Sequence, residues 1–263
     1  MNQEKLLSIV SVVMNDCSGL INTFNSIKDQ LSEEIEWIVV DGNSSDGTVD
    51  FLKSLNVKYY KWISESDSGM YEAMNKGIRM STGKYLQFLN AGDLCTMDLQ
   101  LCFINKKFKE DLVFFSVDKL DEGLNIIRWK LPDSFLADLS KYASIPHQST
   151  FIRRNVFDKV GLYSLDYKYL GDYDFFCRVF KLYNPSLAFN LGITAVSFIC
   201  NGITFNYRMS IKLLKECSII QMYYYNKINI KTRYLYIIKY LISFFPYHIK
   251  VLNFFRKITG FQQ

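Results

Sequence analysis

Acidic side chains follow three of the apolar runs in the first hundred residues of the sequence. Asp41 comes directly after WIVV, Asp93 comes after YLQFLNAG, and Asp67 comes a few residues after VKYYKWI. In an open parallel sheet, right-handed crossovers bring the ends of successive strands to one edge, where we expect these carboxylates to meet. Such an edge repels the diphosphate of a nucleotide unless a divalent cation lies between the negative partners, and Mg²⁺ or Mn²⁺ suits this role.

A second acidic pair stands at the predicted start of a helix, in the segment GDYDFFCRV. Asp172 and Asp174 are two residues apart, so on a helix their side chains point about 200° away from each other and only one can face a cleft. Asp174 is placed to pair with Arg178 one turn later, whereas Gly171 lets a ligand approach Asp172 closely. Because a helix N-terminus favours an ionised carboxyl group, we predict Asp172 as a general base and Asp174 as a structural residue.

The elements that must position these residues alternate between strands and helices. Apolar runs predict four strands, at 8–13, 37–40, 57–63 and 85–89, and apolar residues at helical spacing predict a helix in each gap, the first capped by Ser18. This βαβαβαβ order predicts a mostly parallel sheet. The second half predicts helices near 97–108, after Arg154 and over 173–183, strands near 112–117, 125–129 and 193–199, and a loop at 146–150.

The net charge of +5 conceals an asymmetry along the chain. Residues 201–263 carry ten Lys and Arg and one Glu, whereas residues 1–200 carry 21 Lys and Arg against 25 Asp and Glu. The basic tail is also rich in aromatic and aliphatic residues, which is typical of helices that lie in a membrane interface. Amphipathic helices packed on the body with lysines facing water have the same composition, so both readings stay open.

Several classes of protein are disfavoured by what the sequence lacks. No G-x-G-x-x-G or Walker-type motif follows the first predicted strand, which argues against dehydrogenases and kinases. The six cysteines show no C-x-x-C pair and no zinc spacing with the two histidines, so we expect a reduced, cytosolic protein. We expect no nucleic-acid partner, no signal sequence and no membrane-spanning segment.

Four segments, in order, resemble the inverting glycosyltransferases of family 2, which have a GT-A fold. They are SIVSVVMND, EWIVVDGNSSDGT, ISESDSGMYEAMNKGIRMSTGKYLQFLNAGD and GDYDFFCRV, and the resemblance covers roughly residues 7–200. LNAGD together with PHQSTFIRRNVFDKVGLYSLDYKYLGDYD resembles bacterial enzymes of surface-polysaccharide and O-antigen assembly. The resemblance implies an α/β fold with a GT-A-like, mostly parallel nucleotide-binding sheet flanked by helices over 1–203, and a basic amphipathic helical extension over 204–263.

The resemblance also implies roles for single residues. Asp172 becomes the catalytic base, Asp93 the ligand of the metal and diphosphate, and His147 a residue of the acceptor side. Asn90 and Gly92 stand where many members of the family have carboxylates, so we expect the cation to arrive with the nucleotide. Donor binding is implied for a set of polar residues: Ser11, Asn15, Asp41, Asp67, Asn75 and Asn90.

The activity implied in this way is a metal-dependent, inverting transfer of a sugar, expected to be a hexose, from a nucleotide-diphosphate donor, expected to be UDP-linked, with Mn²⁺ or Mg²⁺. The expected acceptor is a glycan or glycolipid, with the saccharide linked to lipid diphosphate, in bacterial polysaccharide biosynthesis. The protein would then be cytoplasmic and peripheral on the anionic inner face of the membrane. The alternative is a non-catalytic sugar-nucleotide or glycan-binding protein, which the reduced N-A-G-D cluster favours.

Overall fold

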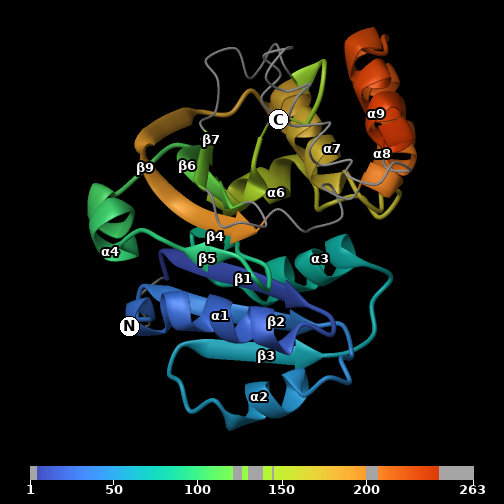
Figure 1. Cartoon of the computed structure of the whole chain (residues 1–263). Coiled ribbons are helices and arrows are strands. Elements are labelled where there is room, and N and C mark those ends of the chain that lie inside the picture. Colours follow the sequence, from blue (N-terminus) through green and yellow to red (C-terminus); the bar gives the residue numbers. More distant parts are fainter. Residues whose placement is uncertain (1–4, 121–125, 130–138, 144, 200–206, 243–263) are drawn as a thin grey trace.

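The strands of the protein form one mixed sheet. The computed structural model of the chain describes residues 5–120, 126–129, 139–143, 145–199 and 207–242. Within these ranges nine strands join in the order β3-β2-β1-β4-β8-β6-β9-β5, with β7 paired to β6 (Figure 1). The strands are β1 (Leu7–Val13), β2 (Ile35–Asp41), β3 (Tyr60–Ser64), β4 (Tyr85–Phe88), β5 (Leu94–Cys95), β6 (Leu112–Leu120), β7 (Ile126–Trp129), β8 (Thr150–Arg153) and β9 (Leu187–Ile199).

The helices connect these strands and extend the chain beyond the sheet. Figure 1 shows β1 to β3 with α1 and α2 at one end of the molecule and α7, α8 and α9 at the other. The α-helices are α1 (Cys17–Ile27), α2 (Thr48–Ser54), α3 (Met70–Met80), α4 (Leu99–Cys102), α6 (Arg154–Val160), α7 (Gly171–Arg178), α8 (Ser210–Tyr225) and α9 (Ile230–Ile242). Short turns add η1 (Lys28–Gln30), η2 (Ile104–Lys106), η3 (His147–Ser149), η6 (Tyr207–Met209) and the π-helical η4 (Val179–Tyr183).

The first half of the chain confirms the predicted βαβαβαβ order. Strand β1 pairs in parallel with β2 and β4, and β2 pairs in parallel with β3. Every residue of β1 and β2 is buried, as expected for strands covered on both faces. The carboxyl ends of these strands therefore share one edge of the sheet.

One capping prediction is wrong. Helix α1 is capped by Asp16, whose side chain accepts a hydrogen bond from Gly19 N at 2.9 Å, and Ser18 lies inside the helix. A Cβ at Gly19 would lie 2.2 Å from the Asp16 carboxylate, so glycine makes room for this cap. Both Asp and Ser are favoured caps, and the helix begins two residues earlier than a Ser18 cap allows.

The second half departs from the predictions at its short elements. The helix predicted near 97–108 is a single turn, α4, followed by η2, and the loop predicted at 146–150 is η3 followed by β8. Strands β5 and β8 have two and four residues, and β8 runs antiparallel to its neighbours β4 and β6. Segments this short show too few residues for a periodic pattern to identify them.

The two faces of the sheet build two hydrophobic cores. Alternate residues of the strands point to opposite faces, so Val10 and Val12 join one core while Ile9 and Val13 join the other. The first core contains residues of α3, α6, α7 and α8, and the second contains residues of α1, α2 and α4.

The C-terminal helices belong to the first of these cores. Leu213, Cys217 and Ile220 of α8 are at most 1% exposed and pack in that core, and α9 packs against α8. The predicted domain boundary at 203 and 204, and the predicted extension over 243–263, lie outside the described residues. Among the described residues, no helix combines the length and the hydropathy that crossing a membrane requires.

Candidate active site

The carboxyl edge of the parallel strands brings the predicted acidic residues to one side of the sheet. Asp41 is the last residue of β2 and pairs in register with Val13 of β1. The chain after β4 runs alongside the end of β1, since Ala91 N donates to Val12 O at 3.2 Å. Asp41 and the turn that carries Asp93 therefore meet at the same edge, as the strand pattern predicts.

Asp93 closes a tight turn and is almost fully buried. Asp93 N donates to Asn90 O, Asn90 N donates to Asp93 Oδ2, each at 3.0 Å, and Gly92 supplies the positive φ of 90° between them. The Asp93 residue is 8% exposed. Burial raises the pKa of its carboxyl group to about 7, although the nearby charge of His147 opposes this shift. A positive charge placed beside this carboxyl group would favour its ionised form.

His147 links this turn to Asp172 at the start of α7. His147 Nδ1 lies 3.1 Å from Asp172 Oδ2, and because a carboxylate can only accept, the imidazole donates. Burial lowers the pKa of His147, but the hydrogen bond and charge of Asp172 and the charge of Asp93 outweigh it, so the pKa is raised above 6.5. The three residues that the sequence predicts for metal, acceptor and base thus form one electrostatic group.

Tyr71 is a further member of this group that the sequence reasoning missed. Its hydroxyl lies 3.1 Å from Asp172 Oδ1 and 3.0 Å from Tyr169 O. Burial and the charge of Asp172 raise the pKa of this phenol well above 10, so it remains a donor. A Cβ at Gly171 would lie 2.8 Å from the Tyr71 ring. The glycine was predicted to admit a ligand; in the structure it admits this ring.

Asp174 has the structural role predicted for it. It is 3% exposed and accepts from Arg178 Nε at 2.9 Å, the expected pairing one turn along the helix. Tyr224 of α8 donates to its other oxygen at 2.9 Å. The Asp172 carboxylate, by contrast, keeps 19% of its side chain exposed. The two acidic side chains of α7 therefore serve opposite faces, as the helix geometry predicts.

A second group lies around Asp41, on the side of β2 and β3. Asp41 Oδ2 accepts from Ser64 Oγ at 2.6 Å and from Ser44 N at 3.0 Å. Asp67 Oδ2 would lie 2.9 Å from a Cβ at Gly42, so the backbone at Gly42 and the Asp67 carboxylate are in close contact. Met14, which is 65% exposed, packs on the same glycine position.

Three other predicted donor residues form hydrogen bonds within the protein. Asn15 joins the end of β1 to the loop after β2, because its Oδ1 accepts from Ser45 N at 2.8 Å. Ser11 is fully buried, donates to Leu89 O and accepts from the indole of Trp37. Asn75 is 4% exposed and exchanges two hydrogen bonds with the backbone of Tyr163. The structure brings Ser11 and Asn75 to the core rather than to the group around Asp93.

Some of the buried polar atoms that have no hydrogen-bond partner among the described residues lie at this edge. They include Asp41 Oδ1, Asn90 Oδ1 and His147 Nε2. Buried polar atoms in folded proteins are almost always paired, so such a set fits a polar ligand. No group of three or more His, Cys, Asp or Glu side chains within the described ranges could hold a metal ion. Asp93 and Asn90 fit a cation only if the ligand itself supplies further oxygens.

Comparison with known sequences identifies relatives over most of the chain. The profile of Glycosyl transferase family 2 matches residues 8–169. An uncharacterized glycosyltransferase of Mycobacterium tuberculosis is 31% identical over 191 residues, which cover 70% of this chain and 72% of that protein. A PGL/p-HBAD biosynthesis glycosyltransferase of Mycobacterium bovis is 33% identical over 190 residues, which cover 69% of this chain and 72% of that protein.

Solved structures share the fold at low sequence identity. S. aureus TarS, residues 1–349, has a TM-score of 0.62 at 13% identity and covers 90% of this chain and 71% of that one. The mannosyltransferase PcManGT of Pyrobaculum calidifontis, in complex with GDP-Man and Mn²⁺, has a TM-score of 0.59 at 11% identity. The match covers 99% of this chain and 82% of that one. With the profile match and the strand-end carboxylates, these findings show that the chain belongs to glycosyl transferase family 2 and has the GT-A fold.

Proposed function

We propose that the protein is an inverting glycosyltransferase that moves a hexose from a UDP-linked donor to a saccharide acceptor. The observation that carries this proposal is the convergence of Asp93, His147 and Asp172 beside buried polar atoms that have no partner among the described residues. A donor diphosphate would approach Asp93, and an acceptor alcohol would approach Asp172. Inversion follows because one carboxylate acting as a base needs no covalent intermediate.

The hydrogen bonds of Asp172 leave one acceptor position for the incoming alcohol. Oδ1 accepts from Tyr71 Oη at 3.1 Å and from Tyr173 N at 2.9 Å, whereas within the described part of the chain Oδ2 accepts only from His147. A carboxylate offers about four lone-pair sites, so the fourth, on Oδ2, is free. In the proposed step the acceptor hydroxyl gives its proton to Oδ2 as its oxygen bonds to the anomeric carbon, and the bond from that carbon to the diphosphate breaks.

The donor end fits a nucleotide held with a divalent ion. Asp41, Asp67 and Met14 would border the base and ribose, and Asn90 and Asp93 would border the diphosphate. Mn²⁺ or Mg²⁺ bound with the donor would offset charge on the departing diphosphate. Support comes from relatives in structure: TarS has been solved with UDP and with UDP-GlcNAc, and PcManGT with GDP-Man and Mn²⁺.

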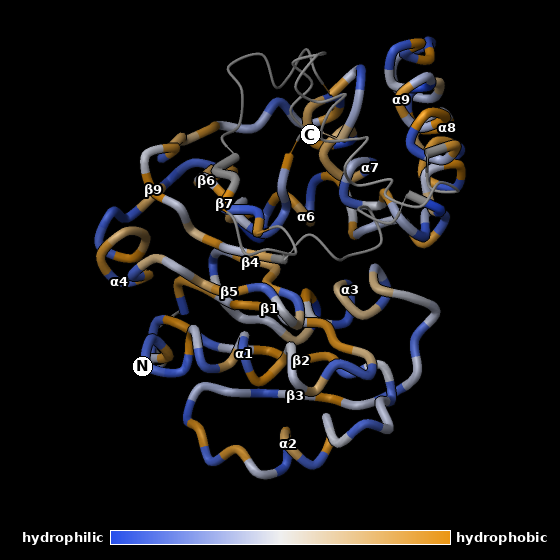
Figure 2. Tube along the Cα trace, viewed as in Figure 1, coloured by the Kyte–Doolittle hydropathy of each residue, from blue (hydrophilic) through white to orange (hydrophobic). Residues whose placement is uncertain are grey.

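We propose a lipid-linked glycan, such as an O-antigen precursor, as the acceptor, and the inner face of the cytoplasmic membrane as the place of reaction. The support comes from α8 and α9, along which hydrophobic and hydrophilic residues are interleaved (Figure 2), and from the exposure of their large hydrophobic side chains. Tyr223 is 76% exposed, Met222 is 52% exposed and Ile230 is 66% exposed. Exposed cations accompany them: Lys212, Lys215, Lys227, Lys231 and Arg233.

Binding to anionic vesicles tests the membrane proposal. Each basic residue near an anionic surface contributes about 1 kcal/mol, so four engaged residues would retain the protein at low ionic strength. We expect co-sedimentation with phosphatidylglycerol vesicles that falls as salt rises, and a loss of binding when Lys227, Lys231 and Arg233 are changed to Gln. No binding at low ionic strength would rule the surface out as a membrane contact.

A nucleotide-sugar screen tests the transfer reaction itself. A ligand that binds only the native state raises the melting temperature, so UDP-sugars with Mn²⁺ should raise it more than either component alone. The donor identified in this way is then incubated with saccharide acceptors, and UDP release and the anomer of the product are measured by NMR. The proposal fails if no nucleotide sugar shifts the melting temperature and none is turned over.

One observation favours a different function, a non-catalytic sugar-nucleotide-binding protein. Asn90 and Gly92 leave Asp93 without a second carboxylate in its turn, which weakens the case for a resident metal. Such a protein would bind the donor in the same screen and release no UDP with any acceptor. The His147 contact with Asp172 argues for catalysis, because a binding protein has no need of an oriented base.

A further inference from the structure

The tail carries one acidic residue, Glu216, and its carboxylate binds backbone N–H groups of residues 168–170, just before the proposed base. Glu216 Oε1 accepts from Lys168 N at 2.9 Å, and Oε2 accepts from Tyr169 N and Leu170 N, each at 2.9 Å. Helix α7 begins at the next residue, Gly171. Three consecutive backbone N–H groups are thus held by one side chain that lies 46 to 48 residues away in the sequence.

These contacts hold the chain at the N-cap of α7 from another helix. The first N–H groups of a helix have no intrahelical partner, and a capping side chain usually satisfies one of them. The N-cap residue of α7 is Leu170, whose side chain makes no capping hydrogen bond. Of the three N–H groups that Glu216 binds, that of Leu170 belongs to the N-cap residue and the other two precede it, whereas Tyr173 N in the first turn donates to Asp172 Oδ1. The charge of Glu216 is favourable at the positive end of the α7 dipole.

Residues 168–170, which Glu216 binds, are connected to Asp172 through Tyr71. The Tyr71 hydroxyl contacts both Tyr169 O, inside the segment, and Asp172 Oδ1, just after it. Helix α8 holds α7 at a second place, where Tyr224 donates to Asp174 at 2.9 Å. A shift of residues 168–170 would therefore move the Tyr71 contact and the first turn of α7 together.

We propose that Glu216 is a positioning residue that fixes residues 168–170 and so aims the Asp172 carboxylate at the acceptor hydroxyl. This inference rests on the proposed function, since it assigns Glu216 a part in the same transfer. It gives the basic tail a second role besides surface contact. The donor side is built from β1, β2 and β4, and among the described residues it forms no hydrogen bond with Glu216, so the effect should fall on turnover and spare donor affinity.

The test compares Glu216→Ala and Glu216→Gln with a matched control, Asp98→Ala. Asp98 is also a carboxylate that caps a helix, accepting from Leu101 N at 2.8 Å, but α4 lies on the other core. Small displacements of a catalytic group can reduce rates by up to about 100-fold, so we expect Glu216→Ala to lower kcat by 10- to 100-fold. The donor Kd should stay within about twofold of the unmodified protein in each variant.

The conservative variant and a spectroscopic readout separate positioning from general destabilisation. The amide oxygen of Gln can still accept from part of the segment, so Glu216→Gln should retain more turnover than Glu216→Ala. A less firmly held Asp172 should also bring the pKa of His147, measured by NMR titration, closer to its ordinary value, because the contact with Asp172 raises that pKa. Asp98→Ala should lower the melting temperature while leaving kcat and the His147 titration unchanged.

The outcomes distinguish failure of this inference from failure of the proposed function. If the unmodified protein turns over and Glu216→Ala matches Asp98→Ala in kcat and in the His147 titration, the positioning role is wrong. It is also wrong if donor Kd weakens by the same factor as kcat falls. If the unmodified protein shows no turnover with any donor, the proposed function and this inference fall together.

Discussion

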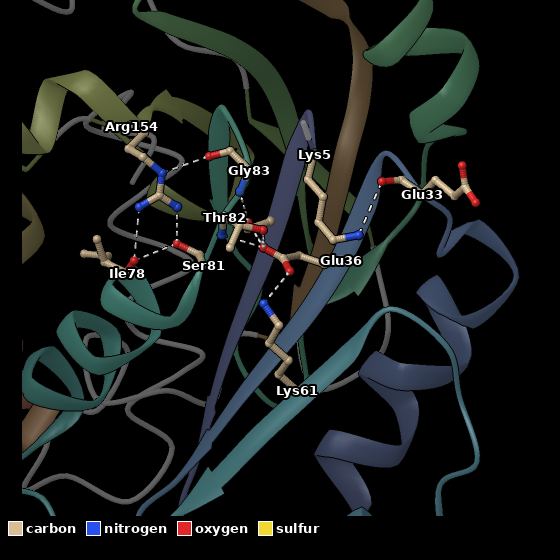
Figure 3. A network of polar contacts seen from close by, with 10 residues as sticks. Lys5, Glu33, Glu36, Lys61, Ile78, Ser81, Thr82, Gly83 and Arg154 are labelled. Carbon is tan, nitrogen blue, oxygen red and sulfur yellow. Dashed lines mark hydrogen bonds and ion pairs between the residues drawn. The ribbon is translucent and has the colours of Figure 1, made fainter. Parts of the chain in front are cut away.

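The two ends of the parallel strands carry buried polar groups of opposite kinds. At the amino end, Glu36 is fully buried and accepts from Ser8, Thr82 and Lys61, at 2.6 to 3.2 Å (Figure 3). Arg154 lies beside this network and donates to Gly83 O at 3.0 Å, to Ile78 O and to Ser81. Each of these groups finds its partners inside the protein.

At the carboxyl end the pairing is incomplete. Asp41, Asn90 and His147 each keep one buried polar atom that has no partner in the part of the chain that the structure describes. Leaving a buried polar group unpaired is costly, so these three atoms are candidates for contact with a ligand. Both ends are rich in polar residues, so residue type alone does not separate structure from site; the Glu36 network is satisfied within the protein, whereas Asp41, Asn90 and His147 each keep an unpaired atom among the described residues.

The largest expected effect at the carboxyl end comes from Asp172→Asn. The amide cannot take the acceptor proton, and a positioned general base contributes roughly 10²- to 10⁴-fold, so kcat should fall by about 10³-fold. Donor Kd and melting temperature should change little, because the amide is isosteric. Asp174→Asn is the matched control, and it should lower stability through its Arg178 and Tyr224 contacts while reducing kcat far less. If Asp172→Asn keeps kcat within tenfold of the original value, Asp172 is not the general base.

At the amino end, Glu36→Ala should lower the unfolding free energy and leave kcat unchanged, which is the reverse of the result expected for Asp172→Asn. This variant leaves the donors of Ser8, Thr82 and Lys61 without their shared acceptor. Breaking a buried, hydrogen-bonded charge of this kind typically costs about 3 kcal/mol of unfolding free energy, which urea denaturation can measure. The kcat of the folded fraction should be unchanged, and a large loss of kcat at full folding would show that the two ends are not independent.

The sequence was sufficient to predict the carboxyl edge, because parallel topology places successive strand ends together. Asp41 and Asp93 meet there, and Asp174 pairs with Arg178, since each prediction rests on a local period or on a rule of topology. The short antiparallel strands β5 and β8 were not predictable in this way. Their residues pair with segments far along the chain, and a run of four residues or fewer contains no sequence pattern that indicates such a pairing.

The contacts that orient the base could not be predicted from the sequence for the same reason. Tyr71 meets Asp172 across 101 residues, and Gly171 indicated only that something approaches closely. Ser11 and Asn75 look like ligand-binding residues in the sequence, yet their partners lie 78 and 88 residues away in the core. Whether a polar side chain is already satisfied is a property of the tertiary structure.

Tyr71→Phe should have a smaller effect than Asp172→Asn at the same end. It removes one hydrogen bond to a carboxylate, which is worth about 1.5 kcal/mol or more, so kcat should fall roughly tenfold. The ring that packs on Gly171 remains, so the fold should be kept. Steady-state kinetics and thermal melting measure both properties. An unchanged kcat would mean that the hydroxyl has no part in orienting the base.

Acid should weaken the amino end. Burial raises the pKa of Glu36, but its hydrogen bonds from Ser8, Thr82 and Lys61 outweigh burial and lower the pKa below 4.5. A carboxyl group with a lowered folded-state pKa stabilises the protein above its unfolded pKa and loses this contribution as pH falls through the folded value. The difference in unfolding free energy between the original protein and Glu36→Gln should therefore narrow below about pH 4.5. A constant difference from pH 7 to pH 3 would contradict this.

His147 should give the opposite pH dependence at the carboxyl end, and the smallest effect of the set. Its pKa is raised above 6.5, against the effect of burial, by the carboxylates of Asp172 and Asp93. A raised histidine pKa stabilises the fold fully below the unfolded pKa, and the contribution is lost as pH rises through the folded value. The stability difference between the original protein and His147→Gln should thus shrink above about pH 6.5, the range in which Glu36→Gln is constant. If both variants lost their difference in the same pH range, the two ends would not be the separate electrostatic units that their hydrogen bonds indicate.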